Sequence, residues 1–153
     1  MTISNPNPAV AGRIVGWIIA VILTLCAFGF YYAHQVRATG FFTAGFTAEL
    51  AVLLYVSILY LIVNATAKLL TDRKGSLAMV ELLGALLTGF ATLCLFVVFP
   101  FNFAHVGDVL PSLLQPLLRW VTNDIGRILY AVAVFGSVIA IIVDSAKLLT
   151  ARN

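Results

Sequence analysis

Residues 50–67 read LAVLLYVSILYLIVNATA, and this uncharged, apolar run decides what kind of protein the chain can be. A helix of roughly 20 apolar residues crosses the hydrocarbon core of a membrane, because a helix pairs its own backbone polar groups where water is absent. Three further runs of this kind occur at residues 14–32, 77–99 and 128–143. The sequence therefore predicts an all-α integral membrane protein with four transmembrane helices.

The composition supports one membrane domain. The chain has 153 residues, of which 62% are hydrophobic and 10% are charged, whereas about a quarter of the residues in a soluble domain are charged. We expect a single four-helix domain over residues 13–153 and a flexible tail over residues 1–12, where Pro6 and Pro8 oppose a helix before Gly12. The first apolar run is longer than the core of a signal peptide, so we expect it to be retained.

The basic residues predict an orientation. One side of a four-helix topology receives six of them and the other side receives three: Arg13, Lys68, Arg73, Lys74, Lys147 and Arg152 against Arg37, Arg119 and Arg127. Because basic residues concentrate on the cytoplasmic side, both termini are expected in the cytoplasm, in a plasma membrane or a bacterial inner membrane. The expected partners are membrane lipids, whose anionic headgroups attract these side chains. The net charge of +3 is too small and dispersed to predict nucleic-acid binding.

Two segments of the chain repeat. Residues 24–34, TLCAFGFYYAH, resemble residues 92–105, TLCLFVVFPFNFAH, and AKLLTDR at residues 67–73 resembles AKLLTAR at residues 146–152. Matching Cys, His and Lys residues are less expected by chance in membrane helices than matching Leu and Ala. We interpret the chain as two tandem helical hairpins, residues 13–73 and 81–152, that are parallel copies related by a pseudo-twofold axis along the membrane normal.

The second outer loop has a helical pattern of its own. Its apolar residues recur at spacings of three and four: Leu110, Leu113, Leu114, Leu117, Leu118 and Val121. This spacing predicts an amphipathic interfacial helix over about residues 109–122, anchored by Trp120 at headgroup depth.

Four charged residues at the predicted helix ends are candidates for ion pairs in the membrane. When the two copies of the repeat are aligned, Arg13 corresponds to Glu81, and Glu49 corresponds to within one position of Arg127. Equivalent positions in the two copies therefore carry opposite charges. A pseudo-twofold bundle could pair Arg13 with Glu81 and Glu49 with Arg127. The alternative is that all four lie in headgroup water and contribute little.

His34 and His105 occupy equivalent positions at the outer edge of the predicted helices. Two such histidines could supply the axial ligands of one haem or bind a metal ion. The alternative is a pair of interfacial histidines, because no carboxylate or third ligand lies at a helical spacing from either one. Cys26 and Cys94 are expected to behave as small apolar residues; a disulfide would require their Cα atoms to lie within about 7 Å.

Small residues at helical spacing predict where helices pack closely, because they let two backbones approach each other. The candidates are Gly12, Gly16 and Ala20 in the first helix, Ala85 and Gly89 in the third, and Gly136 and Ala140 in the fourth.

The sequence contains no phosphate loop, nucleophile elbow, His-Glu-x-x-His motif or paired intramembrane carboxylates, so we do not expect an enzyme. The leading hypothesis is a non-catalytic transmembrane subunit, or an accessory or assembly component, of a larger membrane complex with other protein subunits. The first alternative is a small homo-oligomeric channel or carrier, although the helix centres are almost purely apolar. The second is a haem- or metal-binding redox module that uses His34 and His105.

Overall fold

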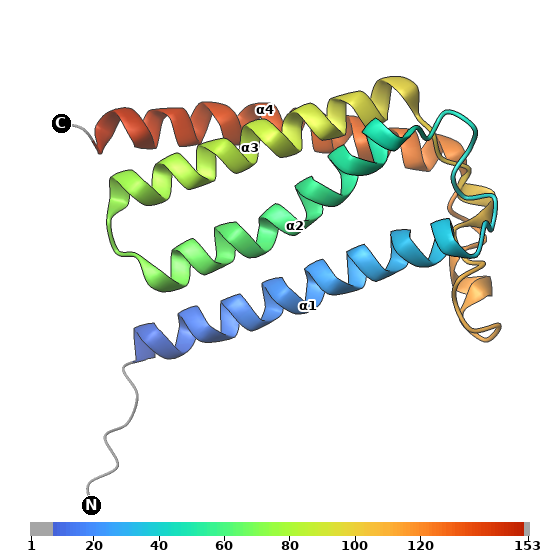
Figure 1. Cartoon of the computed structure of the whole chain (residues 1–153), viewed down its shortest axis with the longest axis horizontal. Helices are drawn as coiled ribbons and strands as arrows, with labels where there is room; N and C mark the ends of the chain where they lie inside the picture. The colour runs from blue at the N-terminus through green and yellow to red at the C-terminus, as the bar shows by residue number, and fades with distance from the viewer. Residues whose placement is uncertain (1–7, 152–153) are drawn as a thin grey trace, which may run out of the picture.

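The computed structural model describes residues 8–151, and four long helices dominate it (Figure 1). The helices, in chain order, are α1 (Pro8–Val36), α2 (Ala48–Leu70), α3 (Lys74–Val98), the short 3-10 helices η1 (Phe103–His105) and η2 (Gln115–Leu118), and α4 (Asn123–Thr150). Each of the four long helices is long and apolar enough to cross a membrane. The predicted all-helical class and the four predicted helices of membrane-spanning length are therefore confirmed.

The first helix begins earlier than its prolines suggested. α1 starts at Pro8, whereas the prediction placed residues 8–12 in the tail. Proline is tolerated in the first turn of a helix, because the N–H that it lacks would have no helical partner there. The rest of the predicted tail, residues 1–7, lies outside the described residues.

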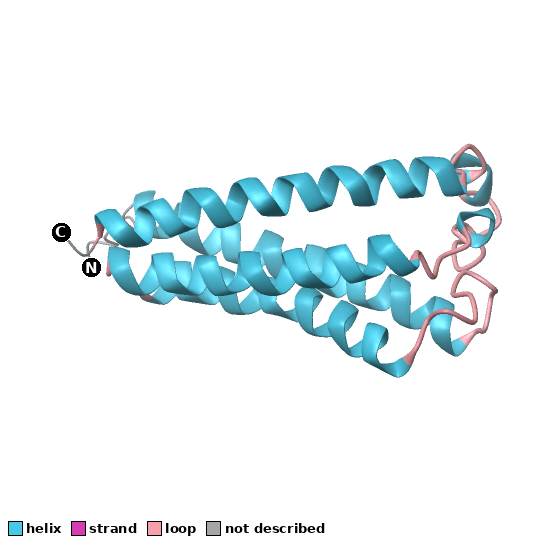
Figure 2. Ribbon diagram, turned by 90° about the horizontal axis from the view of Figure 1, so that it is seen from above, coloured by secondary structure: helices cyan, strands magenta, loops and turns pink. Residues whose placement is uncertain are grey.

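The four long helices pack in chain order. α1 contacts α2, α2 contacts α3, and α3 contacts α4; among these four helices no other pair has Cα atoms within 8 Å. Figures 1 and 2 show the helices running antiparallel to their neighbours. The end where α1 begins, α4 ends and α2 joins α3 is called the terminal end below, and the opposite end is called the loop end.

An aromatic core fills the loop end. Its buried residues are Phe41, Leu50, Leu54, Ile58, Leu95, Phe101 and Val106. At its centre, Phe41 is 1% exposed, and the ring centroids of Phe101 and Phe103 lie 5.4 and 5.5 Å from its own. These distances are typical of favourable aromatic pairs.

Backbone hydrogen bonds join the α1–α2 connection to the segment after α3. The Thr43 N–H donates to the Pro100 carbonyl at 3.0 Å, and the Asn102 N–H donates to the Phe41 carbonyl at 2.7 Å. α3 stops just before this segment, because Phe99 adopts a left-handed conformation (φ 44°) and Pro100 has no N–H to continue the helix. The two loop-end connections thus form one packed unit.

Residues 109–122 do not form the single helix that their apolar spacing predicted. The segment consists of turns and the short 3-10 helix η2. Pro111 and Pro116 lack the backbone N–H groups that a continuous α-helix would use, and their rings obstruct the preceding turn. Trp120 remains 66% exposed at the loop end.

The predicted packing residues divide into two groups. Gly89 lies where α3 meets α4, and a Cβ at this position would be 3.2 Å from the Cβ of Ser137. In contrast, a Cβ at Gly12, Gly16 or Gly136 would meet nothing within 4 Å. The glycine in closest contact between two long helices is one the prediction omitted: a Cβ at Gly84 of α3 would lie 2.6 Å from the ring of Tyr60 in α2.

Candidate functional site

A groove with polar walls runs between α2, α3 and α4, with a volume of about 390 Å³. Its acidic and amide residues are Glu81, Asp144 and Asn64, its hydroxyl residues include Thr88, Thr92 and Ser137, and its small residues include Ala85, Gly136 and Ala140. This set is called the polar groove below. Three predicted helix-packing residues, Ala85, Gly136 and Ala140, thus line an open groove.

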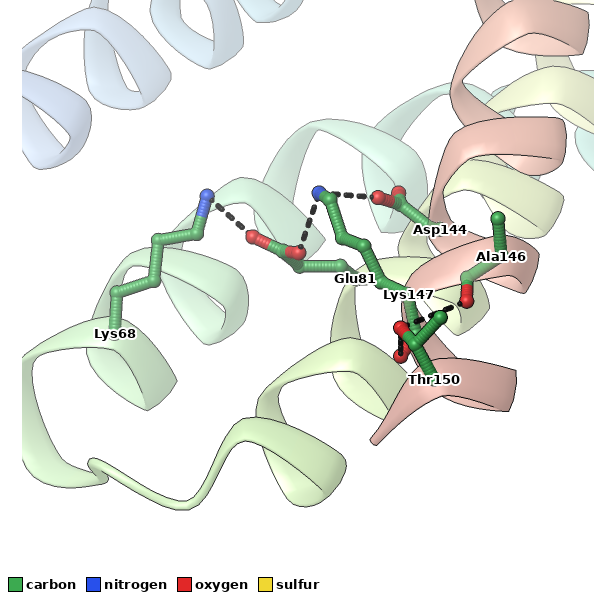
Figure 3. Close-up of polar contacts among 6 residues, drawn as sticks. All are labelled: Lys68, Glu81, Asp144, Ala146, Lys147 and Thr150. Carbon is green, nitrogen blue, oxygen red and sulfur yellow. Dashed lines mark hydrogen bonds and ion pairs between the residues drawn. The ribbon is translucent and has the colours of Figure 1, made fainter. Parts of the chain in front are cut away.

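Charged side chains from three helices meet at the terminal end of the polar groove (Figure 3). Lys68 of α2 and Lys147 of α4 bind the two carboxylate oxygens of Glu81 in α3, with N–O distances of 2.9 and 3.1 Å. Lys147 also lies 2.7 Å from the carboxylate of Asp144. The side chains of Glu81 and Asp144 are only 14% and 11% exposed, while both lysines are half exposed. Two lysines therefore neutralise two largely buried carboxylates.

The structure does not bring together the ion pairs that the repeat suggested. Arg13 pairs with Asp72, in the connection between α2 and α3. An Arg13–Glu81 pair would need α1 beside α3, and these helices are not in contact. At the loop end, the Arg127 guanidinium lies 5.0 Å from the centroid of the Phe99 ring, as in a cation–π interaction. Within residues 8–151, Glu49 forms no ion pair.

Asn64 carries a polar atom that the described residues leave unpaired. Its side-chain oxygen is buried and has no hydrogen-bond partner within residues 8–151. A buried acceptor without a partner costs about 1–3 kcal/mol. On the same helix, the Tyr60 hydroxyl donates to the Val80 carbonyl of α3 at 2.9 Å, while on α4 the Ser137 hydroxyl donates to Ala133 of its own helix. Asn64 is therefore the wall residue with capacity for a further donor.

His34 is part of the aromatic core. It is 1% exposed, and its ring centroid lies 4.6 Å from that of Phe30 and 4.5 Å from that of Phe41. Its Nδ1 atom is 2.6 Å from the Thr39 hydroxyl, and its Nε2 atom is buried with no hydrogen-bond partner within the described residues. The position at the membrane edge did not predict this burial, because it depends on Phe41 folding back over the helix end.

His105 lies on the other side of the same turn. Its Nδ1 atom is 2.8 Å from a carboxylate oxygen of Asp108. Its ring covers Gly40, where a Cβ would lie 3.3 Å from the imidazole, and Gly40 has a φ of +88°, which glycine adopts without strain. The structure thus places both predicted histidines around residues 39–40, where each holds a loop in position.

These contacts bear on ligand binding at the loop end. Within the described residues, no group of three or more His, Cys, Asp and Glu side chains is arranged to hold a metal ion. Each Nδ1 atom already has a protein partner, and the His34 ring is enclosed by phenylalanines. Cys26 and Cys94 are free thiols on α1 and α3, which are not in contact. The geometry favours packing and loop-positioning roles for the two histidines.

Several residues in these contacts were missed by reasoning from the sequence, namely Trp17, Tyr60, Asn64, Asp72 and Gly84. Lys68 and Lys147 offered a signal, because both belong to the repeated AKLLT segment and both bind Glu81.

No family model, curated protein or solved structure matches this chain.

Proposed function

We propose that this chain is a non-catalytic four-helix subunit, or an assembly component, of a larger membrane complex, and that a transmembrane helix of another polypeptide occupies the polar groove. The observation that carries the proposal is the position of this groove. Its amide, hydroxyl and small residues lie along helices long and apolar enough to cross the hydrocarbon, and no Cα atoms of α1 and α4 lie within 8 Å of each other to enclose it.

Lipid tails are a poor match for such a surface. They offer no hydrogen bond to Asn64 or to the hydroxyls of Thr88 and Thr92. A helix with small and hydrogen-bonding residues fits better, because small residues permit close approach and polar side chains pair across helices. The partner helix is expected to bring hydrogen-bonding side chains to the hydroxyl residues that line the groove.

The charged residues of the groove support a structural role over catalysis. Glu81 and Asp144 are paired with lysines from the neighbouring helix or the same helix, an arrangement that a structural role accounts for. These ion pairs hold α2, α3 and α4 together at the terminal end.

The alternative function is a small homo-oligomeric channel or carrier. The same groove favours it, because a second copy of the chain could supply the missing wall and enclose the polar residues as a pathway. The two functions differ in the identity of the polypeptide that faces Ser137.

The topology forms part of the same proposal. We infer that residues 13–73 and 81–152 are duplicated hairpins and that the termini face the cytoplasm. The duplication is supported by α1–α2 and α3–α4, which are both antiparallel pairs joined at the loop end. The orientation is supported by the excess of basic residues at the terminal end. Reporter fusions after residue 153 and within the connection before α4 test the orientation: only the first is expected to be active as a cytoplasmic reporter, and the reverse result would contradict it.

Site-specific photocrosslinking in the native membrane tests the subunit proposal. A photoreactive residue at position 137 faces the polar groove, and one at position 139 is the matched control on the same helix, where Ile139 is 62% exposed. Position 137 is expected to crosslink one different polypeptide at fixed stoichiometry, and position 139 is not. Crosslinks from position 137 to a second copy alone would favour the channel or carrier, and no protein crosslink would contradict both.

A groove-filling variant shows whether the captured polypeptide depends on this surface. Gly136→Leu places a side chain in the groove at a position where a Cβ meets nothing within 4 Å, and Gly29→Leu adds the same volume at another position with the same open space. Gly136→Leu is expected to abolish copurification of the partner after gentle extraction, whereas Gly29→Leu retains it. Equal retention by both variants would contradict the proposal.

A further inference from the structure

A second groove lies between α1 and α2 at the terminal end, with a volume of about 510 Å³. Arg13 and Lys68 lie at its charged end, Trp17 forms part of one wall, and Gly16, Ala20 and Leu23 continue it along α1. This set is called the basic groove below. Its volume falls within the roughly 300–1,000 Å³ of small-molecule sites in proteins.

The length and polarity of the basic groove match half of a lipid bilayer. At 1.5 Å per residue, Arg13 and Leu23 are separated by about 15 Å along the helix axis, and the hydrocarbon core is roughly 30 Å thick. The groove therefore spans about one leaflet, with cations at the helix termini and apolar residues toward the membrane centre. A molecule with an anionic head and one long apolar chain has the same distribution.

The two cations at the charged end can accept an anion without losing much. Arg13 pairs with Asp72 and Lys68 with Glu81, but the side chains of Arg13 and Lys68 are 42% and 51% exposed. The Arg13–Asp72 pair is exposed on both sides and stabilises the protein weakly, and Glu81 keeps Lys147 as a second partner if Lys68 turns to an anion. A guanidinium also carries five N–H donors, so Arg13 can bind a carboxylate and a phosphate together.

The charge of the whole terminal end favours an anionic headgroup. In the described part of the chain, basic residues outnumber acidic ones there: Arg13, Lys68, Arg73, Lys74 and Lys147 against Asp72, Glu81 and Asp144. Basic residues near a membrane surface attract anionic lipids.

The wall of the groove is partly fixed in place. The Trp17 indole N–H donates to the Thr66 hydroxyl of α2 at 3.0 Å, which links the two helices beside the groove. At Gly16 the neighbouring space is open, since a Cβ there would meet nothing within 4 Å. The Trp17 ring is therefore held in place beside the open part of the groove at Gly16.

From these observations we propose that the basic groove binds one anionic glycerophospholipid. Its phosphate lies between Arg13 and Lys68, and one acyl chain lies over Gly16, Ala20 and Leu23, beside the Trp17 ring. Leu61 and Asn64 of α2 line both grooves. The lipid site is filled from α1 at Gly16, however, whereas the site of the partner helix proposed above is filled from α4 at Gly136. The two proposals can therefore succeed or fail separately.

Fluorescence quenching by lipids with brominated acyl chains tests this site. The full-length chain carrying Trp120→Phe leaves Trp17 as its one tryptophan, and it is reconstituted into phosphatidylcholine vesicles. A small fraction of brominated phosphatidylglycerol or of brominated phosphatidylcholine is then added. The proposal expects Trp17 to be quenched at much lower fractions of the anionic lipid. Equal quenching by the two brominated lipids would overturn it.

Charge-removing variants separate this site from the general surface charge. Each basic residue near the surface contributes about five-fold in affinity, so Arg13→Gln with Lys68→Gln is expected to weaken preferential quenching by roughly 25-fold. Arg73→Gln with Lys74→Gln removes the same charge from the same end but from residues that do not line the groove, and it is expected to weaken the preference much less, because neither side chain contacts the proposed phosphate. Equal losses in both double variants would assign the preference to surface charge and overturn the site.

A variant that keeps every charge tests the acyl-chain part. Gly16→Leu fills the basic groove, and Gly29→Leu adds the same side chain to an open position on α1 outside the groove. Gly16→Leu is expected to abolish the preferential quenching, while Gly29→Leu retains it, with both variants showing unchanged helical circular dichroism. Preserved quenching in Gly16→Leu would contradict the assignment.

Discussion

The two ends of this molecule are built in different ways. At the loop end, Phe41 and its aromatic neighbours form a buried core, and hydrogen bonds join the α1–α2 connection to the segment after α3. At the terminal end, the helices are held by lysine–carboxylate pairs, and both grooves described above open there or nearby. The closely packed end provides stability, while the open, charged end offers surface for other molecules.

This difference predicts where substitutions are costly. Apolar packing in a core contributes several kcal/mol per large side chain, whereas exposed ion pairs contribute from zero to about 1 kcal/mol. Substitutions at the loop end should therefore lower the free energy of unfolding, and those at the terminal end should affect binding more than folding.

The largest effect is expected at the centre of the aromatic core. Phe41→Ala leaves a cavity among packed rings and is expected to lower the free energy of unfolding by about 3–5 kcal/mol, measured by denaturation in detergent micelles. Phe90→Ala is the matched control, because Phe90 is 58% exposed on α3. Similar losses in the two variants would remove the distinction between a packed end and the lipid-facing surface.

A contact between helices should give the next largest effect. Gly84→Ala places a methyl group 2.6 Å from the Tyr60 ring, and the hydrogen bond from Tyr60 to Val80 restrains that ring. We expect a loss of about 1–3 kcal/mol in the free energy of unfolding. Gly136→Ala meets open space and should instead stabilise α4 by about 0.5–1 kcal/mol. Thermal denaturation of both variants checks the opposite signs, and the same sign in both would contradict this contact.

The polar pair inside the loop end should have a smaller effect with a distinctive pattern. Thr39→Val removes the hydroxyl beside the His34 Nδ1 atom, leaving that atom buried without a partner at a cost of about 1–3 kcal/mol. Adding His34→Phe to Thr39→Val removes the unpaired nitrogen, so the double variant should recover most of the loss in unfolding free energy. Denaturation of the single and double variants measures this recovery. If the double variant is stable but no longer copurifies with the partner, or lacks a visible absorption band that the unaltered protein shows, His34 has a role beyond packing.

The smallest effect is expected at the terminal end. Glu81→Gln breaks the contacts with Lys68 and Lys147, and the half-exposed lysines can turn to water. The free energy of unfolding should fall by about 1 kcal/mol at most, and the difference should shrink as salt is raised. Melting temperatures at low and high salt test this expectation. A larger, salt-independent loss would show that the terminal end stabilises the fold as much as the loop end does.

The helices themselves could be predicted from the sequence, and their neighbours could not. The length of each apolar run suffices to identify a membrane span, as residues 50–67 show. In a lipid environment, however, an apolar residue can face either a neighbouring helix or the membrane, so the sequence does not mark the contact face. The repeat suggested pairs between equivalent helices, but the short connection at residues 71–73 keeps α2 beside α3.

The candidate sites were predictable only in part. The equivalence of Lys68 and Lys147 in the repeat was visible, but their convergence on Glu81 requires the angles at which α2 and α4 approach α3. The prediction of an interfacial helix over residues 109–122 was wrong for a local reason, because it rested on the apolar spacing and ignored the effect of Pro111 and Pro116 on the backbone. The burial of His34 depends on Thr39 and Phe41, which contact its ring after the chain has reversed direction.

The hydrogen bonds from Thr43 to Pro100 and from Asn102 to Phe41 also impose an order on folding during synthesis. The ribosome completes α1 and α2 before it adds Pro100 and Asn102, the two residues that bond to the connection between these helices. The α1–α2 connection can acquire these contacts only after Pro100 and Asn102 have been added to the chain. The packing of the loop end is therefore completed only after α3 and the segment that follows it have been synthesised.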